Sequence, residues 1–214
     1  LDNVVTWNED LNALEKQRIA ASETRRLGLG VMGIADMLNQ LGVAYDSEQG
    51  SMMIEKVMEY ITNAAYQASA SIAKEKSPSP IFNEETYMEC PFVKEALSEQ
   101  TQNVIRKNGL RNIAIMSIAP TGSISNIVLG YKGEEKNYIG VSGGVEPVFS
   151  VFYTRRSESF GNKFFKVFHS TIQAYIDMAG IQNEVDATDD VDSVLPEYLT
   201  RTAHKVDSIK RVGI

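Results

Sequence analysis

The most informative segment of the sequence reads NIAIMSIAPTGSISNI and occupies residues 112–127. Its first half, residues 112–119, is short and mostly apolar, which is typical of a strand covered on both faces. Pro120 then forces the chain to turn, because proline fixes its own backbone angle and lacks an N–H group. We expect a buried strand that runs into a loop and then into the start of a helix.

The loop after Pro120 has the residues of a phosphate site, namely Thr121, Gly122, Ser123, Ile124 and Ser125. Backbone amides at a helix start, together with the positive end of the helix dipole, bind an anion without needing a lysine. Gly122 lets the backbone approach a ligand closely. The alternative is that the Thr121 or Ser123 hydroxyl caps a helix, and such caps outnumber phosphate sites. Both interpretations stay open on spacing alone.

Helices and strands alternate on both sides of this segment. Apolar residues recur with helical spacing between Ser51 and Lys76, and Ser77-Pro78-Ser79-Pro80 ends that helix. Further helices are predicted at residues 9–24, 34–41, 93–107 and 164–178, strands at 27–33, 112–119 and 145–153, a loop at 82–92, an acidic linker at 186–192 and an amphipathic piece at 195–209. This alternation favours an α/β layer or barrel built with parallel strands.

Composition narrows the class of protein. The 214 residues are 43% hydrophobic and 23% charged, as in a soluble globular protein. A formal charge of -7 argues against a nucleic-acid groove, since such grooves collect Lys and Arg. One cysteine, Cys90, excludes an internal disulfide or a cysteine-rich metal site in these residues, and a reduced, cytoplasmic setting is the default.

The sequence lacks the signals of membrane targeting. Its two ends suggest that it is part of a longer protein. No stretch approaches the roughly 18 apolar residues of a membrane span, and no signal-peptide pattern opens the chain. It starts at Leu1 without Met and stops at Ile214 without a visible terminating element. We therefore expect a cut-out piece.

Other candidate site residues are less persuasive. Gly28, Gly30 and Gly33 form a Gly-x-Gly-x-x-Gly pattern, but they lie inside the apolar run, so close packing of a barrel strand is favoured over a nucleotide loop. Arg155 and Arg156 are adjacent, so in a strand they point to opposite faces. His169 and His204 have no carboxylate nearby in the sequence and are interpreted as surface or capping residues. Cys90 is interpreted as an incidental thiol.

Six motifs, in order and spacing, resemble the C-terminal half of the barrel domain in the large, catalytic subunit of ribonucleotide reductases. They are Arg25–Asp36, Gly42–Ser47, Leu110–Asn112, Ala119–Ser125, Gly144–Pro147 and Tyr153–Arg156. The resemblance implies that residues 1–214 are a single fragment of a ten-stranded α/β barrel, with helices alternating with mostly parallel strands. It also implies that Thr121, Gly122, Ser123, Ile124 and Ser125 are the loop that binds the substrate phosphates.

The same resemblance implies an oxidoreductase that reduces ribonucleotides to deoxyribonucleotides for DNA synthesis by thiyl-radical chemistry. The family's catalytic cysteines match nothing here, so we expect no catalytic or metal-binding residue in this chain and an inactive fragment. Thr121–Ser125 and the tail Leu195–Asp207 look more like the adenosylcobalamin-dependent enzymes than those that use an iron-containing small subunit, although no cobalamin contact can be assigned.

The implied partners are a ribonucleoside di- or triphosphate, a thioredoxin-like reductant and further copies of the chain, with no nucleic acid and no membrane. Two alternatives remain. One is another phosphate-binding α/β barrel enzyme, for which Asp36 and Glu146 are the acid/base candidates. The other is a non-catalytic nucleotide-binding module.

Overall fold

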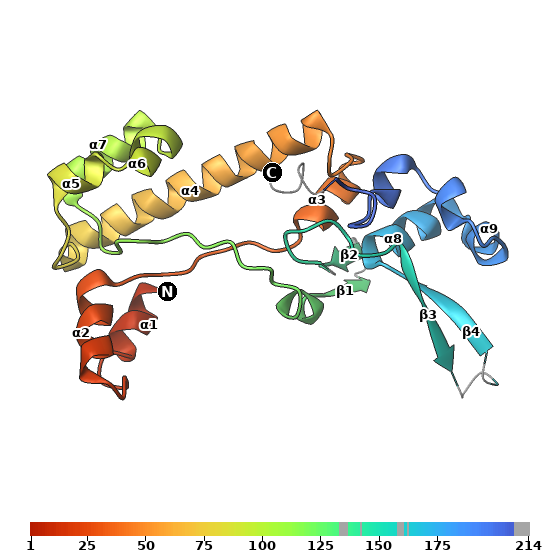
Figure 1. Cartoon of the computed structure of the whole chain (residues 1–214), viewed down its shortest axis with the longest axis horizontal. Coiled ribbons are helices and arrows are strands. Elements are labelled where there is room, and N and C mark those ends of the chain that lie inside the picture. The colour runs from red at the N-terminus through yellow and green to blue at the C-terminus, as the bar shows by residue number, and fades with distance from the viewer. Residues whose placement is uncertain (133–136, 142, 158–160, 162, 208–214) are drawn as a thin grey trace. The chain divides into compact units, whose positions relative to one another are not determined.

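The computed structural model of the protein describes residues 1–132, 137–141, 143–157, 161 and 163–207. The chain divides into two compact units, whose helices and strands are labelled in Figure 1. Unit 1 consists of Leu1–Gly30 and Glu55–Ile118, and unit 2 consists of Val31–Ile54 and Ala119–Ile214.

Unit 1 is helical and is organised by one long helix. Its helices are α1 (Asp2–Trp7), α2 (Glu15–Thr24), the larger part of α4 (Glu48–Lys76), α5 (Glu84–Met88), α6 (Pro91–Ala96) and α7 (Glu99–Asn108). The predicted helix at residues 51–76 is confirmed by α4. Tyr66 and Ala70 on one face of α4 are buried with Val93, Leu97 and Ile105 in one apolar core.

The predicted single helix at residues 93–107 is wrong, because the chain breaks between α6 and α7. Leu97 is extended, and the Ser98 hydroxyl accepts a hydrogen bond of 3.3 Å from the Thr101 amide, which starts a new helix. The helix ends at Gly109 in a positive-φ conformation, as its Asn-Gly sequence predicted. The predicted loop at residues 82–92 also contains the short helix α5, which the Asn83 side chain caps.

The strands predicted at residues 27–33 and 112–119 are wrong, because the structure has one isolated parallel bridge in their place. Leu29 and Met116 make a parallel bridge, and the Leu27 and Leu29 amides donate to the carbonyls of Ala114 and Ile115 at 2.8 Å. A Cβ atom on Gly30 would lie 2.5 Å from the Ser117 carbonyl oxygen, so close backbone packing explains this glycine.

Unit 2 contains α3 (Ile34–Gln40) and the start of α4, followed by 3-10 helix η1 (Ile124–Ile127) and hairpin strands β1 (Leu129–Lys132) and β2 (Asn137–Gly140). A second hairpin, β3 (Phe152–Ser157) with β4 (Lys163–Phe168), precedes α8 (Ser170–Ala179), α9 (Gln182–Ala187), η3 (Val191–Ser193) and η4 (Glu197–Thr200). Both hairpins are antiparallel, so the parallel pairing predicted from the alternation is confined, among described residues, to the bridge in unit 1.

Several predicted boundaries in unit 2 are wrong. The strand predicted at 145–153 begins only at Phe152, and the first part of the helix predicted at 164–178 is strand β4. The β4 sequence, KFFKVF, is rich in aromatic residues that favour strands, and it pairs along its length with β3. The acidic linker contains η3 and the end of α9, and of the amphipathic piece only η4 is helical. Ser208 and Ile209 of that piece lie outside the described residues.

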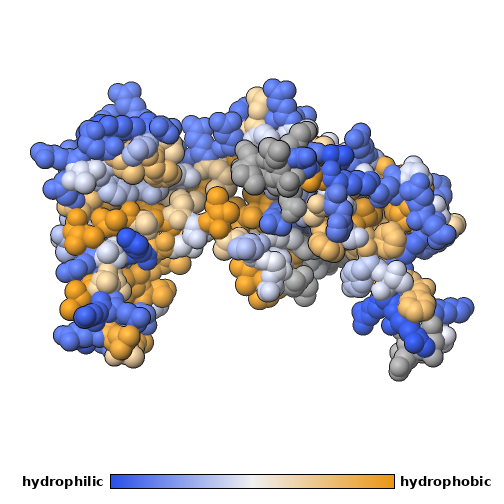
Figure 2. Space-filling view, viewed as in Figure 1, coloured by the Kyte–Doolittle hydropathy of each residue, from blue (hydrophilic) through white to orange (hydrophobic). Residues whose placement is uncertain are grey.

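Apolar side chains reach the surface over α1, α2 and the turn between them, as the orange areas of Figure 2 show. Trp7 is 73% exposed and Leu11 is 76% exposed. Helix α2 has no buried residue, as expected of the surface helix predicted at residues 9–24, but the helix begins only at Glu15. None of the helices in the described part of the chain is both long and apolar enough to cross a membrane.

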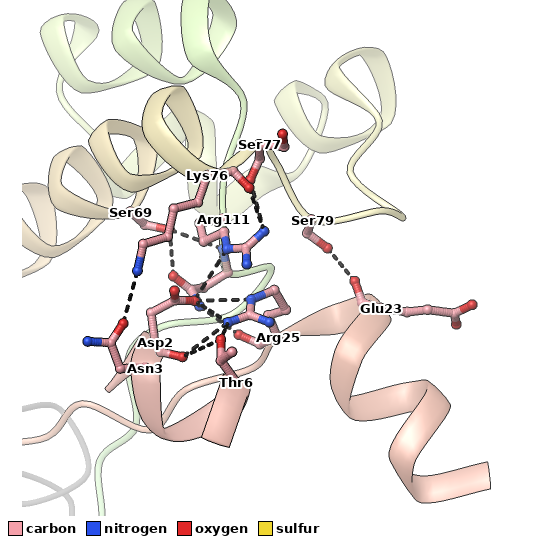
Figure 3. Close-up of polar contacts among 11 residues, drawn as sticks. Asp2, Asn3, Thr6, Glu23, Arg25, Ser69, Lys76, Ser77, Ser79 and Arg111 are labelled. Carbon is pink, nitrogen blue, oxygen red and sulfur yellow. Dashed lines mark hydrogen bonds and ion pairs between the residues drawn. The ribbon is translucent and has the colours of Figure 1, made fainter. Parts of the chain in front are cut away.

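A buried network of polar groups ties the first helix to the rest of unit 1 (Figure 3). The Asp2 carboxylate, in a residue that is 6% exposed, accepts hydrogen bonds from Arg25 at 2.8 Å and from the Asn112 side chain at 3.1 Å. Burial raises the pKa of Asp2, but the hydrogen bonds from Arg25 and Asn112 and the charges of Arg25 and Arg111 outweigh it and lower the pKa below its usual value.

The same network closes the C-terminal end of α4. The Arg111 guanidinium donates hydrogen bonds of 3.0 and 3.1 Å to the carbonyls of Lys76 and Ser77. These carbonyls lie at the negative end of the helix dipole, so a cation there is stabilising. The motif Leu110–Asn112 thus stabilises the end of α4 through Arg111 and binds the Asp2 carboxylate through Asn112.

We expect Asp2→Asn to lower the free energy of unfolding by about 3–5 kcal/mol at neutral pH, because it leaves buried guanidinium charge unpaired. The Asp2 contribution is fully present above the unfolded pKa of 3.8 and is lost as pH falls through the lower folded pKa. Urea denaturation between pH 3 and 7 measures both effects. Asp10→Asn, at an exposed carboxylate, is the control. An Asp2→Asn variant that matched this control would contradict the assignment.

Candidate functional site

The loop predicted to bind phosphate lies on one side of a cleft in unit 2. The cleft has a volume of about 640 Å³, which is within the range of small-molecule sites. It is lined by Pro120 and Gly122 of the loop, by Gly143 and Gly144, by residues 146–150 and by parts of β3, β4 and α8 (Phe152, Tyr153 and residues 167–170). Its wall is therefore built from three separate stretches of chain within one unit, 120–122, 143–153 and 167–170.

The loop itself is a tight turn followed by a single turn of 3-10 helix. The Ser125 amide donates to the Thr121 carbonyl at 3.1 Å, and the Ser125 hydroxyl donates to the Gly122 carbonyl at 2.9 Å. The predicted α-helix start is wrong, because η1 is only four residues long and strand β1 follows almost at once. Ile, Ser and Asn are weak helix formers, which agrees with this short element.

Of the loop, Pro120 and Gly122 line the cleft, whereas Thr121, Ser123, Ile124 and Ser125 do not line it. Among the described residues, no hydrogen bond uses the amides of Ser123 or Ile124. Gly122 faces open space, since a Cβ atom built on it would meet nothing within 4 Å. The arrangement leaves room for a ligand atom beside the backbone.

Thr121 is held in an unusual conformation. Its φ is +52°, in the left-handed region that a β-branched residue rarely adopts, and such strain collects at functional sites. Its Oγ1 atom is buried and lacks a hydrogen-bond partner among the described residues. Thr121 is therefore a polar group that the described protein atoms leave unsatisfied beside the cleft.

Gly143 and Gly144 pack against the loop and against the start of α3. The Gly33 amide donates to the Gly144 carbonyl at 2.9 Å, and Gly33 caps α3 with a φ of +78°. A Cβ atom on Gly144 would lie 1.9 Å from the Pro120 carbonyl oxygen, a contact that no side chain permits. The glycine motif thus serves backbone packing, as predicted for its glycines, and Gly33 also caps α3, which was not predicted; Gly33 holds Gly143 and Gly144 through its amide.

Asp36 and His169 form a buried pair behind this glycine segment. Asp36 is 1% exposed, and its Oδ2 accepts a hydrogen bond of 3.2 Å from the Gly143 amide. Its Oδ1 lies 3.8 Å from His169 Nδ1, which also contacts the Thr171 hydroxyl at 3.0 Å. Burial lowers the pKa of His169, while the charge of Asp36 opposes that shift. The imidazole therefore favours its neutral form.

The interpretation of His169 as a surface or capping residue was wrong in part. It stands at the N-cap position of α8, but its side chain is only 11% exposed and it faces a carboxylate. Asp36 and His169 are 133 residues apart (169 − 36), and no spacing in the sequence signals their contact. His204, in contrast, is exposed, with its ring edge on Phe149.

The other residues considered as candidates in the sequence do not come together in one site. Glu146 lines the cleft, whereas Arg155 and Arg156 are both exposed on β3. Cys90 is an exposed free thiol in unit 1. Among the described residues, no group of three or more His, Cys, Asp or Glu side chains is placed to hold a metal ion. The geometry brings together an open loop, two glycines and a buried carboxylate–imidazole pair.

Comparisons with known proteins agree on one family. The family model described as "Ribonucleotide reductase, barrel domain" matches residues 1–210. A vitamin B12-dependent ribonucleoside-diphosphate reductase of Mycobacterium tuberculosis is 34% identical over 136 residues, 64% of this chain and 16% of the relative. One from Thermoplasma acidophilum is 31% identical over 155 residues, 72% of this chain and 16% of the relative.

A further curated relative and a solved structure belong to the same family. A ribonucleoside-diphosphate reductase subunit alpha of Helicobacter pylori is 33% identical over 148 residues, 60% of this chain and 18% of that protein. The class Id ribonucleotide reductase alpha subunit of Actinobacillus ureae has the same fold, with a TM-score of 0.65 and 20% identity over 98% of this chain and 34% of that one. The chain thus spans less than a fifth of the length of the curated relatives.

The match over residues 1–210 covers both units, so the chain has a barrel-type α/β fold and belongs to the ribonucleotide reductase family.

Proposed function

We propose that this protein is a ribonucleotide reductase, which reduces ribonucleotides to deoxyribonucleotides for DNA synthesis, and that this chain is one fragment of its catalytic barrel domain. The match to the family's barrel domain over residues 1–210 carries the proposal. The three relatives named above as ribonucleoside-diphosphate reductases support the reaction and favour a diphosphate as substrate.

Within this enzyme, we propose that Thr121, Gly122, Ser123, Ile124 and Ser125 bind the substrate phosphates. The open position of Gly122, the amides of Ser123 and Ile124, and the unsatisfied Thr121 hydroxyl support this role. An anion that accepts hydrogen bonds from such amides gains charge-assisted contacts. Backbone amides read charge and not base identity, so this loop would hold all ribonucleotides alike.

The radical chemistry needs groups that this chain does not supply. The family's thiyl mechanism uses cysteines, and the single cysteine here, Cys90, is exposed in unit 1 and is not among the residues that line the cleft. We therefore assign no catalytic residue to this chain. The role of these residues would be to bind and orient the nucleotide while the reacting groups come from other parts of the protein.

We further propose adenosylcobalamin as the radical source, in preference to an iron-containing small subunit, because relatives from two organisms are named as vitamin B12-dependent. Among the described residues, none can be assigned to hold that cofactor, so no step is derived through it. A thioredoxin-like reductant, a homo-oligomeric state and a cytoplasmic location complete the proposal, by likeness to the family.

The activity is tested directly with the whole protein. We expect it to convert a ribonucleoside diphosphate to the 2′-deoxy product when adenosylcobalamin and a dithiol are supplied, with chromatography as the readout. Omitting the cobalamin is the control for the radical source. If neither cobalamin nor an iron-containing small subunit supported formation of a deoxyribonucleotide, the proposed function would be wrong.

Gly122→Val tests the phosphate loop. The new side chain meets no protein atom within 4 Å at its Cβ, so the fold should persist, but it would fill the space beside the loop amides. Losing one or two amide contacts to a charged group costs about 1.5–3 kcal/mol each, so nucleoside diphosphate should bind at least about tenfold more weakly by calorimetry.

Ile127→Ala is the matched control for this experiment, because Ile127 is 76% exposed in the same short helix and is not among the five residues proposed to bind phosphate. Its affinity should equal that of the unmodified protein. Unchanged affinity in Gly122→Val would remove the loop from the phosphate site.

Thr121→Gly tests the backbone strain at residue 121 separately from the role of its hydroxyl in nucleotide binding. Glycine adopts a φ of +52° without strain, so the variant should unfold at a higher temperature, by an amount equivalent to about 1 kcal/mol. It also loses the hydroxyl beside the cleft, so nucleotide affinity should fall. Differential scanning fluorimetry and calorimetry measure the two effects, and a gain in both stability and affinity would show that the hydroxyl takes no part in binding.

A further inference from the structure

The motif Gly42–Ser47 is joined to the wall of the cleft by a hydrogen bond between residues that are far apart in the chain. The Tyr45 hydroxyl, in a residue that is 7% exposed, donates to the Val145 carbonyl at 2.7 Å. Gly144 and Glu146, the neighbours of Val145 in the sequence, both line the cleft. Tyr45 therefore holds the main chain between two residues of the cleft wall.

The contact between this wall and the proposed phosphate loop is direct. A Cβ atom on Gly144 would lie 1.9 Å from the Pro120 carbonyl oxygen and 2.8 Å from Thr121 Oγ1, so the glycine backbone packs on the loop with no space to spare. Closely packed groups transmit small displacements to their neighbours. A displacement of Val145 would thus reach Pro120 and Thr121 through Gly144.

The other end of the same wall is held by the segment that follows η4. The Ala203 amide donates to the carbonyl of Val148, a cleft residue that is 4% exposed, at 2.8 Å. The Arg201 guanidinium forms a two-pronged ion pair with the Asp46 carboxylate, in which Nε lies 2.9 Å from Oδ1. Such a pair fixes the direction as well as the distance of its partners. It joins this segment to the residue that follows Tyr45.

The loop that carries Tyr45 is fixed at both ends. The Val43 amide donates to the Leu38 carbonyl of α3 at 3.0 Å. The Ser47 hydroxyl accepts a hydrogen bond of 3.0 Å from the Gly50 amide and so caps the start of α4. Tyr45 thus reaches the cleft wall from a short loop between two anchored helix ends.

We propose that Tyr45 is a positioning residue for the substrate phosphates, which holds Val145 so that the backbone of Gly144 keeps the phosphate loop in its binding shape. The proposal rests on the proposed function and adds to it a residue outside the loop. Tyr45 is not among the described residues that line the cleft, so it acts on the nucleotide through the main chain of the wall.

Tyr45→Phe in the whole protein tests this role, because it removes the hydroxyl and keeps the buried ring. The loss of one hydrogen bond predicts that a ribonucleoside diphosphate binds about three- to tenfold more weakly by calorimetry. Inorganic pyrophosphate should lose affinity by the same factor, since the effect acts on the phosphates. In turnover, KM should rise while kcat at saturating substrate stays the same, because binding and not the chemical step is changed.

Tyr87→Phe is the matched control. The Tyr87 hydroxyl also donates to a main-chain carbonyl, that of Ile113 at 2.9 Å, but both residues belong to unit 1 and neither lines the cleft. We expect both variants to be less stable in urea, and Tyr45→Phe alone to bind more weakly. Equal weakening of binding in the two variants would assign the effect to a general loss of stability and would overturn the proposal.

The same experiment separates this inference from the proposed function. Unchanged affinity for both ligands in Tyr45→Phe, in a protein that reduces ribonucleotides, would overturn the inference and leave the function standing. Weaker binding of pyrophosphate in Tyr45→Phe, with no ribonucleotide reduction by the unmodified protein, would support the positioning role and contradict the function. Binding of neither ligand by the unmodified protein would overturn both.

Discussion

The contact between Gly144 and the carbonyl of Pro120 is the constraint on which the candidate site depends. A side chain at Gly144 would lie 1.9 Å from that oxygen, so the glycine segment can approach the loop only as bare backbone. The same segment accepts hydrogen bonds from Gly33 and donates one to Asp36. The loop, the first turn of α3 and the Asp36 carboxylate that faces His169 are therefore in contact with one short stretch of main chain.

This construction suits a site that binds a charged group without a lysine or arginine. Amides and hydroxyls supply directional contacts, and glycines leave the space that an anion needs. The proposed substrate, a ribonucleoside diphosphate, would bring such a charged group to this site.

Much of the fold could be predicted from the sequence where the signal was local. The spacing of apolar residues predicted α4, the Asn-Gly pair predicted the end of α7, and the glycines of the apolar run predicted close backbone packing, although no strand forms there. The hairpin β3–β4 was missed because an aromatic segment such as KFFKVF fits either a strand or a buried helix until its pairing partner is known.

The candidate site likewise has a part that local sequence predicted and a part that it did not. The residues of the loop were predicted from their own order, Pro120 through Ser125, but the length of the helix after them was not, because β1 competes for the same residues. The pairing of Asp36 with His169 had no signal at all, since it arises from the packing of α3 near the start of α8 and not from any spacing along the chain. Long-range contacts of this kind are set by tertiary structure.

A crystal structure of the whole protein with a bound ribonucleoside diphosphate tests the central claim most directly. We expect phosphate oxygens within about 2.7–3.2 Å of the Ser123 and Ile124 amides, beside Gly122. Phosphates bound at another part of the protein, with this loop empty or covered by the protein's own side chains, would contradict it.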